Sequence, residues 1–361
     1  MKLTDIVSAN QIEAERIMTI CNSCRYCEGH CAVFPAMEKR IEFEKPDLEY
    51  LANLCHNCGS CYHHCQYADP HEFQINVPQT FSDLRHETYA IYAFPSFMGK
   101  VFENNGMWAT IFTVLSFIFM FALYGGTNSN VNNFYDVIPH NLMVNTFGSV
   151  SIFVFFALVA GIVRYWRALS LPSPFTLNWG HIIIGIKQAL TLKYLDGGSG
   201  DGCTYPNEAP SHARRIFHHL TFYGFMLCFA ATSVGTVYHY VFDWMAPYGY
   251  ISLPKALGIT GGIGLVIGPI GLLWLKQKAD KAPKAKNNKG MDIAFLVLLL
   301  LTSVTGLLLM IAKGSIYIGP TLIIHLSFVL ALFITLPYGK FVHGFYRLIA
   351  LIKYAEENST N

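Results

Sequence analysis

Two cysteine runs near the N-terminus are the part of this sequence best suited to do chemistry. Each run has the spacing C-x2-C-x2-C-x3-C, and together they hold eight of the ten cysteines: Cys21, Cys24, Cys27, Cys31, Cys55, Cys58, Cys61 and Cys65. Bacterial ferredoxins hold [4Fe–4S] clusters with this spacing, and the fourth cysteine of one run binds the cluster of the other run. The runs therefore predict two [4Fe–4S] clusters. By analogy with ferredoxins, Cys65 completes the first set of three and Cys31 completes the second.

Other uses of cysteine fit this pattern less well. Disulfides are rare in a reducing cytoplasm, and structural zinc sites take two C-x2-C pairs separated by about a dozen residues or more. The residue after each run is not the proline found in ferredoxins, and charged residues at helical spacing over 37–53 predict a helical connector between the runs. The pairing of the fourth cysteines therefore stays open. We interpret the nearby histidines His56, His63 and His64 as exposed. We interpret Cys203 and Cys228 as ordinary small residues.

Five further histidines lie in or beside long apolar segments, where an imidazole is costly and points to function. They are His218, His219, His239, His325 and His343. The 18 residues from His325 to His343 make five whole turns of a continuous helix, so both would face one way. Between antiparallel helices, His218 or His219 could meet His343 at the inner side, and His239 could meet His325 at the outer side. Such pairs hold b-type haem, so we expect one haem b and allow a second. Taken singly, each histidine could instead sit at the membrane interface or form an interhelical hydrogen bond.

The segments that must position these histidines have the composition of a membrane domain. The chain is 53% hydrophobic and 13% charged, and its net charge of only +2 argues against a nucleic-acid binder. After residue 100, six stretches of at least twenty residues lack Asp, Glu, Lys and Arg, which is enough for six membrane helices. We predict an all-α membrane protein. Residues 1–100 form an α-helical ferredoxin-like domain with two [4Fe–4S] clusters, and residues 101–361 form a six-helix transmembrane bundle.

Basic residues set the expected orientation in the lipid bilayer. The first ten residues lack the apolar segment of a signal peptide, so we expect the cysteine-rich domain to stay in the cytoplasm. With that orientation, fifteen Lys and Arg residues fall inside, six of them in Lys276–Lys289, and only Lys255 and Lys313 fall outside. Both termini are then cytoplasmic. The segment Trp179–Leu195 is predicted to be amphipathic and to lie along the inner surface.

The chain as a whole resembles the citrate/tricarballylate-utilization protein B family. The matching stretches are ICNSCRYCEGHCAVFPAME, LCHNCGSCYHHCQYADPHEF, RRIFHHLTFYGFMLCFAATSVGTVYHY, GGIGLVIGPIGLL and HLSFVLALFITLPYGKFVHGFYR, and they span nearly the whole sequence. The membrane half is also similar to the haem-bearing subunits of nitrate and heterodisulfide reductases. The resemblance implies a protein of the bacterial inner membrane. It would accept electrons from an FAD-containing dehydrogenase on a separate chain, which oxidises tricarballylate or a citrate-related acid, and pass them through the clusters and haem b to the quinone pool.

No nucleophile, acid–base pair or flavin-binding fingerprint is legible, so no catalytic residue is expected in this chain. We expect an electron-transfer subunit of a dehydrogenase:quinone oxidoreductase system. Two other functions stay open. The first is an iron–sulfur redox sensor attached to a membrane transporter or anchor, since the glycines at 261–264 and Gly268–Pro269 would suit broken transporter helices. The second is the same relay serving a different dehydrogenase.

Overall fold

The computed structural model describes residues 8–124, 134–170, 178–197, 200–246, 248–283, 289–312 and 314–359. Among these residues the only strands are β1 (Cys203–Thr204) and β2 (Pro210–Ser211), which form one short antiparallel pair. The predicted all-α class is confirmed. Three parts of the orientation argument lie outside the described residues: positions 127–133 of the first outer loop, positions 284–288 of the lysine run, and Lys313.

The N-terminal head consists of helices around one apolar core. Its helices are α1 (Ala9–Cys24), α2 (Val33–Met37), α3 (Lys45–Leu54), α4 (Ser60–His63) and α5 (Val77–Tyr92). Helix α1 begins with a capping box, in which the Ser8 side chain accepts from the Gln11 amide and the Gln11 side chain accepts from the Ser8 amide. It ends at Arg25, whose φ of 55° is left-handed. Helix α3 lies within the connector that was predicted to be helical.

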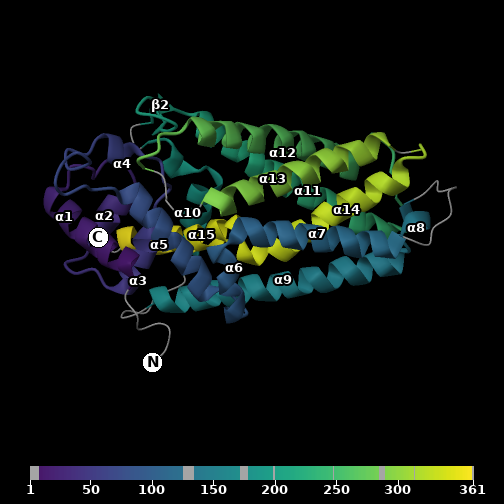
Figure 1. The fold of residues 1–361 in the computed structure, drawn as a ribbon, viewed down its shortest axis with the longest axis horizontal. Helices are drawn as coiled ribbons and strands as arrows, with labels where there is room; N and C mark the ends of the chain where they lie inside the picture. Colours follow the sequence, from purple (N-terminus) through teal and green to yellow (C-terminus); the bar gives the residue numbers. More distant parts are fainter. Residues whose placement is uncertain are drawn as a thin grey trace.

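Six helices of the membrane domain are long and apolar enough to cross a bilayer, as predicted. They are α7 (Asn105–Tyr124), α9 (His140–Leu169), α11 (Ala213–Phe242), α12 (Leu253–Lys278), α13 (Lys289–Ile311) and α14 (Ile318–Thr335). They run along the long axis of the molecule, with the head at one end (Figure 1). Large apolar side chains point outward, and Phe155 and Phe156 are 62% and 60% exposed. Such a surface requires lipid, so the bundle is a multi-pass membrane domain.

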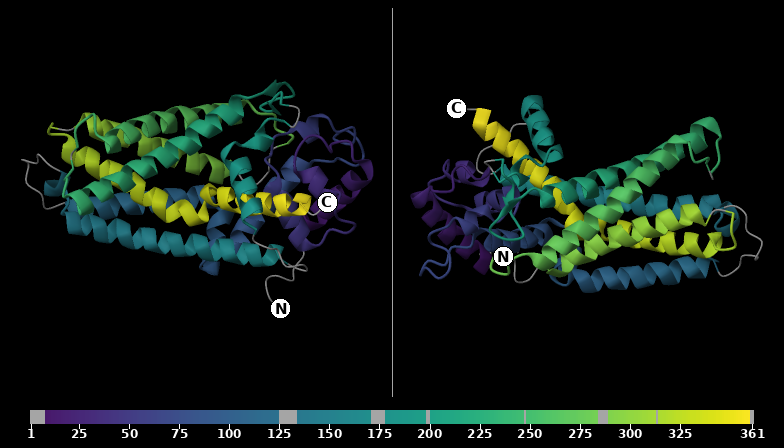
Figure 2. Two further views of the ribbon diagram at one scale, coloured as in Figure 1. Left: turned by 180° about the vertical axis from the view of Figure 1, so that it is seen from behind. Right: turned by 90° about the horizontal axis from the view of Figure 1, so that it is seen from above.

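Other helices connect the bundle to the head. They are α6 (Lys100–Glu103), α10 (Trp179–Leu190) and α15 (His343–Ser359), whereas the short helix α8 (Phe134–Val137) lies at the opposite end of the bundle (Figure 1). Helix α15 leaves the bundle and ends among the head helices, with α10 beside it (Figures 1 and 2). Near its end, Glu357 forms a 2.6 Å ion pair with Arg40 and accepts a 3.0 Å hydrogen bond from Tyr50. The chain's C-terminal helix therefore fixes the head to the membrane domain.

The helix that was assumed to run from His325 to His343 is interrupted. Helix α14 ends at Thr335, two short 3-10 turns follow, and His343 begins α15. Pro337 has no amide to donate, and Gly339 adopts an extended conformation, so regular helical hydrogen bonding stops between the two helices. The five-turn spacing argument is therefore wrong. His343 occupies its place because of the turn, and not because it shares a helix face with His325.

Helices α11 and α12 pack closely through glycines. A Cβ atom on Gly264 would lie 3.0 Å from the Leu220 carbonyl oxygen, and one on Gly261 would lie 2.8 Å from the Gly224 carbonyl oxygen. Helix α12 continues through Pro269 without a break. The glycines thus serve helix packing, and the broken helices that supported the transporter reading are not present in α12.

Replacing Gly268 by Leu is expected to separate α11 from α12. A Cβ atom there would lie 2.6 Å from the Thr221 amide nitrogen and 2.9 Å from the Phe217 carbonyl oxygen, both backbone atoms that cannot move aside. We expect a loss of about 1–3 kcal/mol in stability, measured as a lower midpoint of thermal unfolding in detergent. Gly148→Leu in α9 is the control, because nothing lies within 4 Å of a Cβ atom at that position. An equal loss in both variants would contradict the packing role.

Candidate cofactor sites

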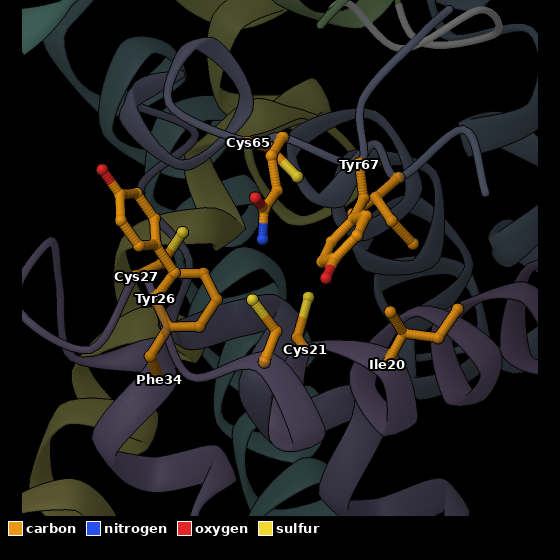
Figure 3. A pocket seen from close by; sticks show the side chains of 10 residues that line it. Ile20, Cys21, Tyr26, Cys27, Phe34, Cys65 and Tyr67 are labelled. Carbon is orange, nitrogen blue, oxygen red and sulfur yellow. The ribbon is translucent and has the colours of Figure 1, made fainter. Parts of the chain in front are cut away.

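The first pocket of the head gathers four cysteines from two distant segments. Cys21 and Cys24 lie in the last turn of α1, Cys27 follows the left-handed Arg25, and Cys65 arrives from the second run. The labelled sulfurs of Cys21, Cys27 and Cys65 face one space between Tyr26 and Tyr67 (Figure 3). Burial, and then the neighbouring thiols, raise the pKa values of Cys21 and Cys27 to about 12. A cationic metal centre would offset both causes by stabilising the thiolates.

The second pocket gathers the other four cysteines of the runs: Cys31, Cys55, Cys58 and Cys61. The loop that carries Cys55, Cys58 and Cys61 turns sharply, because Asn57 and Gly59 have left-handed φ values of 55° and 85°. Burial and the neighbouring thiols raise the pKa values of Cys31 and Cys61 well above the ordinary thiol value. The structure therefore brings Cys65 to the first three cysteines and Cys31 to the second three, which is the exchanged arrangement of ferredoxins.

The donor sets suit a polynuclear cluster better than a single ion. Each pocket offers four thiols, the ligand set of [4Fe–4S] clusters. Across the part of the chain that the structure describes, no three His, Cys, Asp or Glu side chains converge closely enough to hold one metal ion. The residues present fit a cubane.

Three arginines surround the second cysteine loop. Arg85 of α5 donates to the carbonyls of Ala52 (2.9 Å) and Cys55 (2.6 Å), and Arg347 of α15 donates to the Cys55 carbonyl at 2.7 Å. Arg214 of α11 donates to the carbonyls of His56 and Asn57, the first at 3.1 Å. Burial is the main factor that lowers the pKa of Arg347 to about 10, so it stays charged at neutral pH. The second pocket therefore lies in a positive environment supplied mainly by the membrane domain.

Replacing Arg347 by Gln is expected to lower the reduction potential of the centre in the second pocket. Removing a nearby buried positive charge disfavours the more negative reduced state. Potentiometric titration followed by electron paramagnetic resonance should show one iron–sulfur midpoint shifted negative and the other unchanged. Arg347→Lys should largely restore the midpoint, and Arg16→Gln on the exposed face of α1 should leave both unchanged. Equal shifts of both midpoints, or no shift, would contradict this assignment.

Two polar neighbours of Cys58 could not be anticipated from sequence spacing. Cys203, interpreted above as an ordinary residue, is fully buried against Cys58 and donates a 3.0 Å hydrogen bond to the Leu195 carbonyl. The contact with the Cys203 side chain is the largest factor that lowers the pKa of Cys58 to about 6. The interpretation of His56 and His63 as exposed is wrong: His56 is only 4% exposed and bonds to the Leu54 carbonyl, and the His63 side chain is 8% exposed. His64 is exposed. Cys228 lies in the α11–α12 contact, an ordinary packing position.

The inner ends of α11 and α15 bring two histidines together. The ring centroids of His218 and His343 are 6.1 Å apart, with the rings at 75°. An imidazole nitrogen binds a metal at about 2 Å, so two imidazoles at this separation could hold one iron between them. His343 Nδ1 donates to the Lys340 carbonyl, an arrangement typical of metal-binding histidines. Among the described residues, the buried His218 Nδ1 has no hydrogen-bond partner.

The other three predicted histidines have different neighbours. His219 packs beside Tyr223 with ring centroids 5.6 Å apart, so the inner pair uses His218. At the outer end, His239 stacks on His140 at 4.2 Å, and His325 hydrogen bonds to Thr305 at 3.1 Å. The predicted meeting of His239 with His325 is wrong. Helix α11 packs mainly on α12, and α14 packs mainly on α7 and α13, so the two histidines have different neighbours.

A helical head with two sets of four cysteines, carried on six membrane helices, defines a membrane-bound iron–sulfur electron-transfer protein. Comparison with known families identifies it more closely. The model of the citrate utilization protein B family matches residues 107–361, and the model of its Fer4-like domain matches residues 14–91. The chain belongs to the citrate utilization protein B family. Citrate utilization protein B of Escherichia coli is 49% identical over 358 residues, which are 98% of this chain and 94% of that protein. No solved structure matches.

Proposed function

We propose that this chain carries electrons from an FAD-containing dehydrogenase to the membrane quinone pool. The observation that carries the proposal is that three sites lie next to one another. The first cysteine pocket lies in the head, the second lies next to it, and the His218–His343 pair lies at the inner end of the bundle. Arg214 and Arg347 donate to the second cysteine loop and stand one helical turn from His218 and His343. The second pocket and the histidine pair are thus immediate neighbours.

The residues that would hold each group follow from this geometry. Cys21, Cys24, Cys27 and Cys65 would hold one [4Fe–4S] cluster, and Cys31, Cys55, Cys58 and Cys61 the other. His218 and His343 would hold one haem b. When bound, these groups accept and release single electrons. The protein's part is to keep the thiolates and imidazoles in place, to exclude water from the second pocket, and to supply the positive charges of Arg85, Arg214 and Arg347.

In this proposal, the partner dehydrogenase oxidises tricarballylate or a citrate-related acid. Support comes from membership of the citrate utilization family. Helices α1 and α2 lie at the end of the molecule away from the bundle (Figure 1), and Cys21 and Cys24 lie in the last turn of α1, so we propose that the dehydrogenase docks on the head.

We further propose that the protein lies in the bacterial inner membrane with both termini in the cytoplasm. The excess of Lys and Arg in the loops on the head side supports this orientation. The end of α15 lies in the head, so the described N- and C-terminal helices share one side of the membrane (Figure 1). Residues 1–100 would form the cytoplasmic domain, and residues 101–361 the membrane domain.

An absorption spectrum of the detergent-purified protein, oxidised and then reduced with dithionite, tests this function. We expect sharp haem bands that move on reduction, above a broad iron–sulfur shoulder, and rapid reoxidation when a ubiquinone or menaquinone analogue is added. A broad shoulder without haem bands, or reduced protein that the quinone analogues leave reduced, would overturn the proposal. Addition of the dehydrogenase and tricarballylate should replace dithionite as the reductant.

A further inference from the structure

A cavity of about 500 Å³ lies where the head meets the membrane domain. Its head side is formed by Asn57 and Gly59, which lie between the cysteines of the second pocket. Its membrane side is formed by the inner ends of α12 and α13, with Leu273, Lys276 and Asp292 in its wall. The cavity belongs to neither cysteine pocket, and nothing in the proposed electron relay so far uses it.

The cavity borders both groups of cofactor residues. Asn57 is the residue before Cys58, and Gly59 is the residue after it, so any occupant lies next to the second cysteine loop. Arg214, also in the wall, donates to the Asn57 carbonyl and stands one turn before His218. An occupant would therefore be within short electron-transfer distance of the second pocket and of the histidine pair.

The cavity also reaches the level of the lipid. Leu273 and Ile293 lie within the predicted membrane spans Leu253–Lys278 and Gly290–Ile311, close to their inner ends. Ile293 is 43% exposed, and the adjacent Trp274 is 47% exposed on the outside of the bundle. An apolar molecule dissolved in the inner leaflet can reach this position without crossing the head.

Polar groups in the wall suit a ring that carries carbonyl oxygens. Asp292 forms ion pairs with Lys276 at 2.6 Å and with Lys340 at 2.9 Å, and Lys340 is three residues before His343. The Lys276 ammonium group has three N–H donors, so it can pair with Asp292 and still donate to a carbonyl oxygen in the cavity. The wall thus combines apolar side chains with a few convergent polar groups, the usual composition of a small-molecule site.

We propose that this cavity binds the head group of the membrane quinone, next to the second cysteine pocket and the His218–His343 pair. The inference rests on the proposed function and gives its electron acceptor a binding site. Reduction of the quinone to the quinol forms two O–H bonds and consumes two electrons and two protons. The electrons come from the organic acid oxidised by the dehydrogenase, and the protons come from water at the cytoplasmic end of the cavity.

A tricarboxylate is the other class of ligand that positive side chains could attract. The wall argues against it, because Asp292 already pairs with Lys276 and with Lys340, and Arg214 is engaged by loop carbonyls. Asp280 adds a second carboxylate to the wall. A tricarboxylate would meet these carboxylates at close range, and like charges in a partly desolvated site repel. The test below includes this ligand.

Filling the cavity with Ile293→Trp, in the full-length protein with its cofactors, tests the proposal. We measure binding of decylubiquinone and of a menaquinone analogue, together with the rate at which each reoxidises dithionite-reduced protein. We expect binding and rate to fall about tenfold or more, while iron content and the reduced haem spectrum stay as in the wild type. Ile152→Trp, on the lipid-facing side of α9 and 61% exposed, is the matched control and should change nothing.

A second variant, Asp292→Asn, removes the charge and keeps the shape of the side chain. It should release Lys276 from its ion pair and so weaken quinone binding and slow reoxidation, while iron content and the reduced haem spectrum stay as in the wild type. Normal binding and reoxidation in both variants would overturn the site while leaving the proposed function intact. Competition of tricarballylate with the quinone analogue in the wild type would overturn the choice of ligand. If even wild-type protein is not reoxidised by quinones, the proposed function itself fails.

Discussion

His343→Ala is expected to abolish the haem absorption of the purified protein and to leave its iron–sulfur absorption in place. The ring centroids of His343 and His218 are 6.1 Å apart. The hydrogen bond from His343 Nδ1 to the Lys340 carbonyl fixes the orientation of the ring and leaves the other ring nitrogen to bind the iron. A methyl group cannot replace that ligand. The measurement is the haem content per chain by pyridine haemochrome, with iron and sulfide determined on the same sample. His218→Ala should give the same result.

The neighbouring histidine supplies a strict control. His219 is adjacent to His218 on α11 but packs beside Tyr223, away from His343. His219→Ala should therefore keep the haem, and so should His239→Ala and His325→Ala at the outer end of the bundle. Full haem content in His343→Ala would retire the assignment. Loss of haem in His239→Ala or His325→Ala would place a haem at the outer end, where the rings do not face one another in the structure.

The cysteine sets were the most predictable part of the site because their geometry is local. Three cysteines within seven residues can turn toward one space only in a tight loop, and the left-handed Arg25 and Asn57 produce these turns. The six spans were equally predictable, since twenty uncharged apolar residues leave a chain few alternatives to a membrane helix. In both cases the information lies in a short stretch of sequence.

Contacts between distant segments were not predictable from spacing. The sequence allowed either His218 or His219 to face His343, and only the placement of α15 decides for His218. The wrong pairing of His239 with His325 had a specific cause: it assumed that the third and sixth spans touch along their whole length. Pro337 and Gly339 end that assumption, because the chain turns between α14 and α15, and His343, beyond the turn, is the residue that meets His218 of α11.

The arginines around the second pocket show a further limit of sequence reasoning. Arg214 and Arg347 were counted only as inside charges that orient the spans. In the structure each donates to the second cysteine loop, and each stands four residues from a histidine of the inner pair. That spacing of four was legible in the sequence as one helical turn. The spacing could be interpreted only once the structure showed that the second cysteine loop lies beside both arginines.

The exchange of the fourth cysteines predicts which double substitutions spare a cluster. Cys21 and Cys65 line one pocket, and Cys31 lines the other. Cys21→Ala with Cys65→Ala should remove one cluster and lower the iron in cubanes from about eight to about four per chain. Cys21→Ala with Cys31→Ala should damage both clusters and remove most of that iron. Iron, sulfide and electron paramagnetic resonance measured on the same samples provide the readout.

The opposite result would show that each run holds its own cluster. In that case the pair Cys21 and Cys31 would spare half of the iron, and the pair Cys21 and Cys65 would lose nearly all of it. Haem content guards against a trivial explanation, because His218 and His343 lie in the membrane domain and keep their contact if the chain folds. Cys228→Ala in the α11–α12 contact should leave both clusters intact. Because the head is joined to the bundle through α15, loss of haem along with iron would indicate unfolding and not loss of ligands.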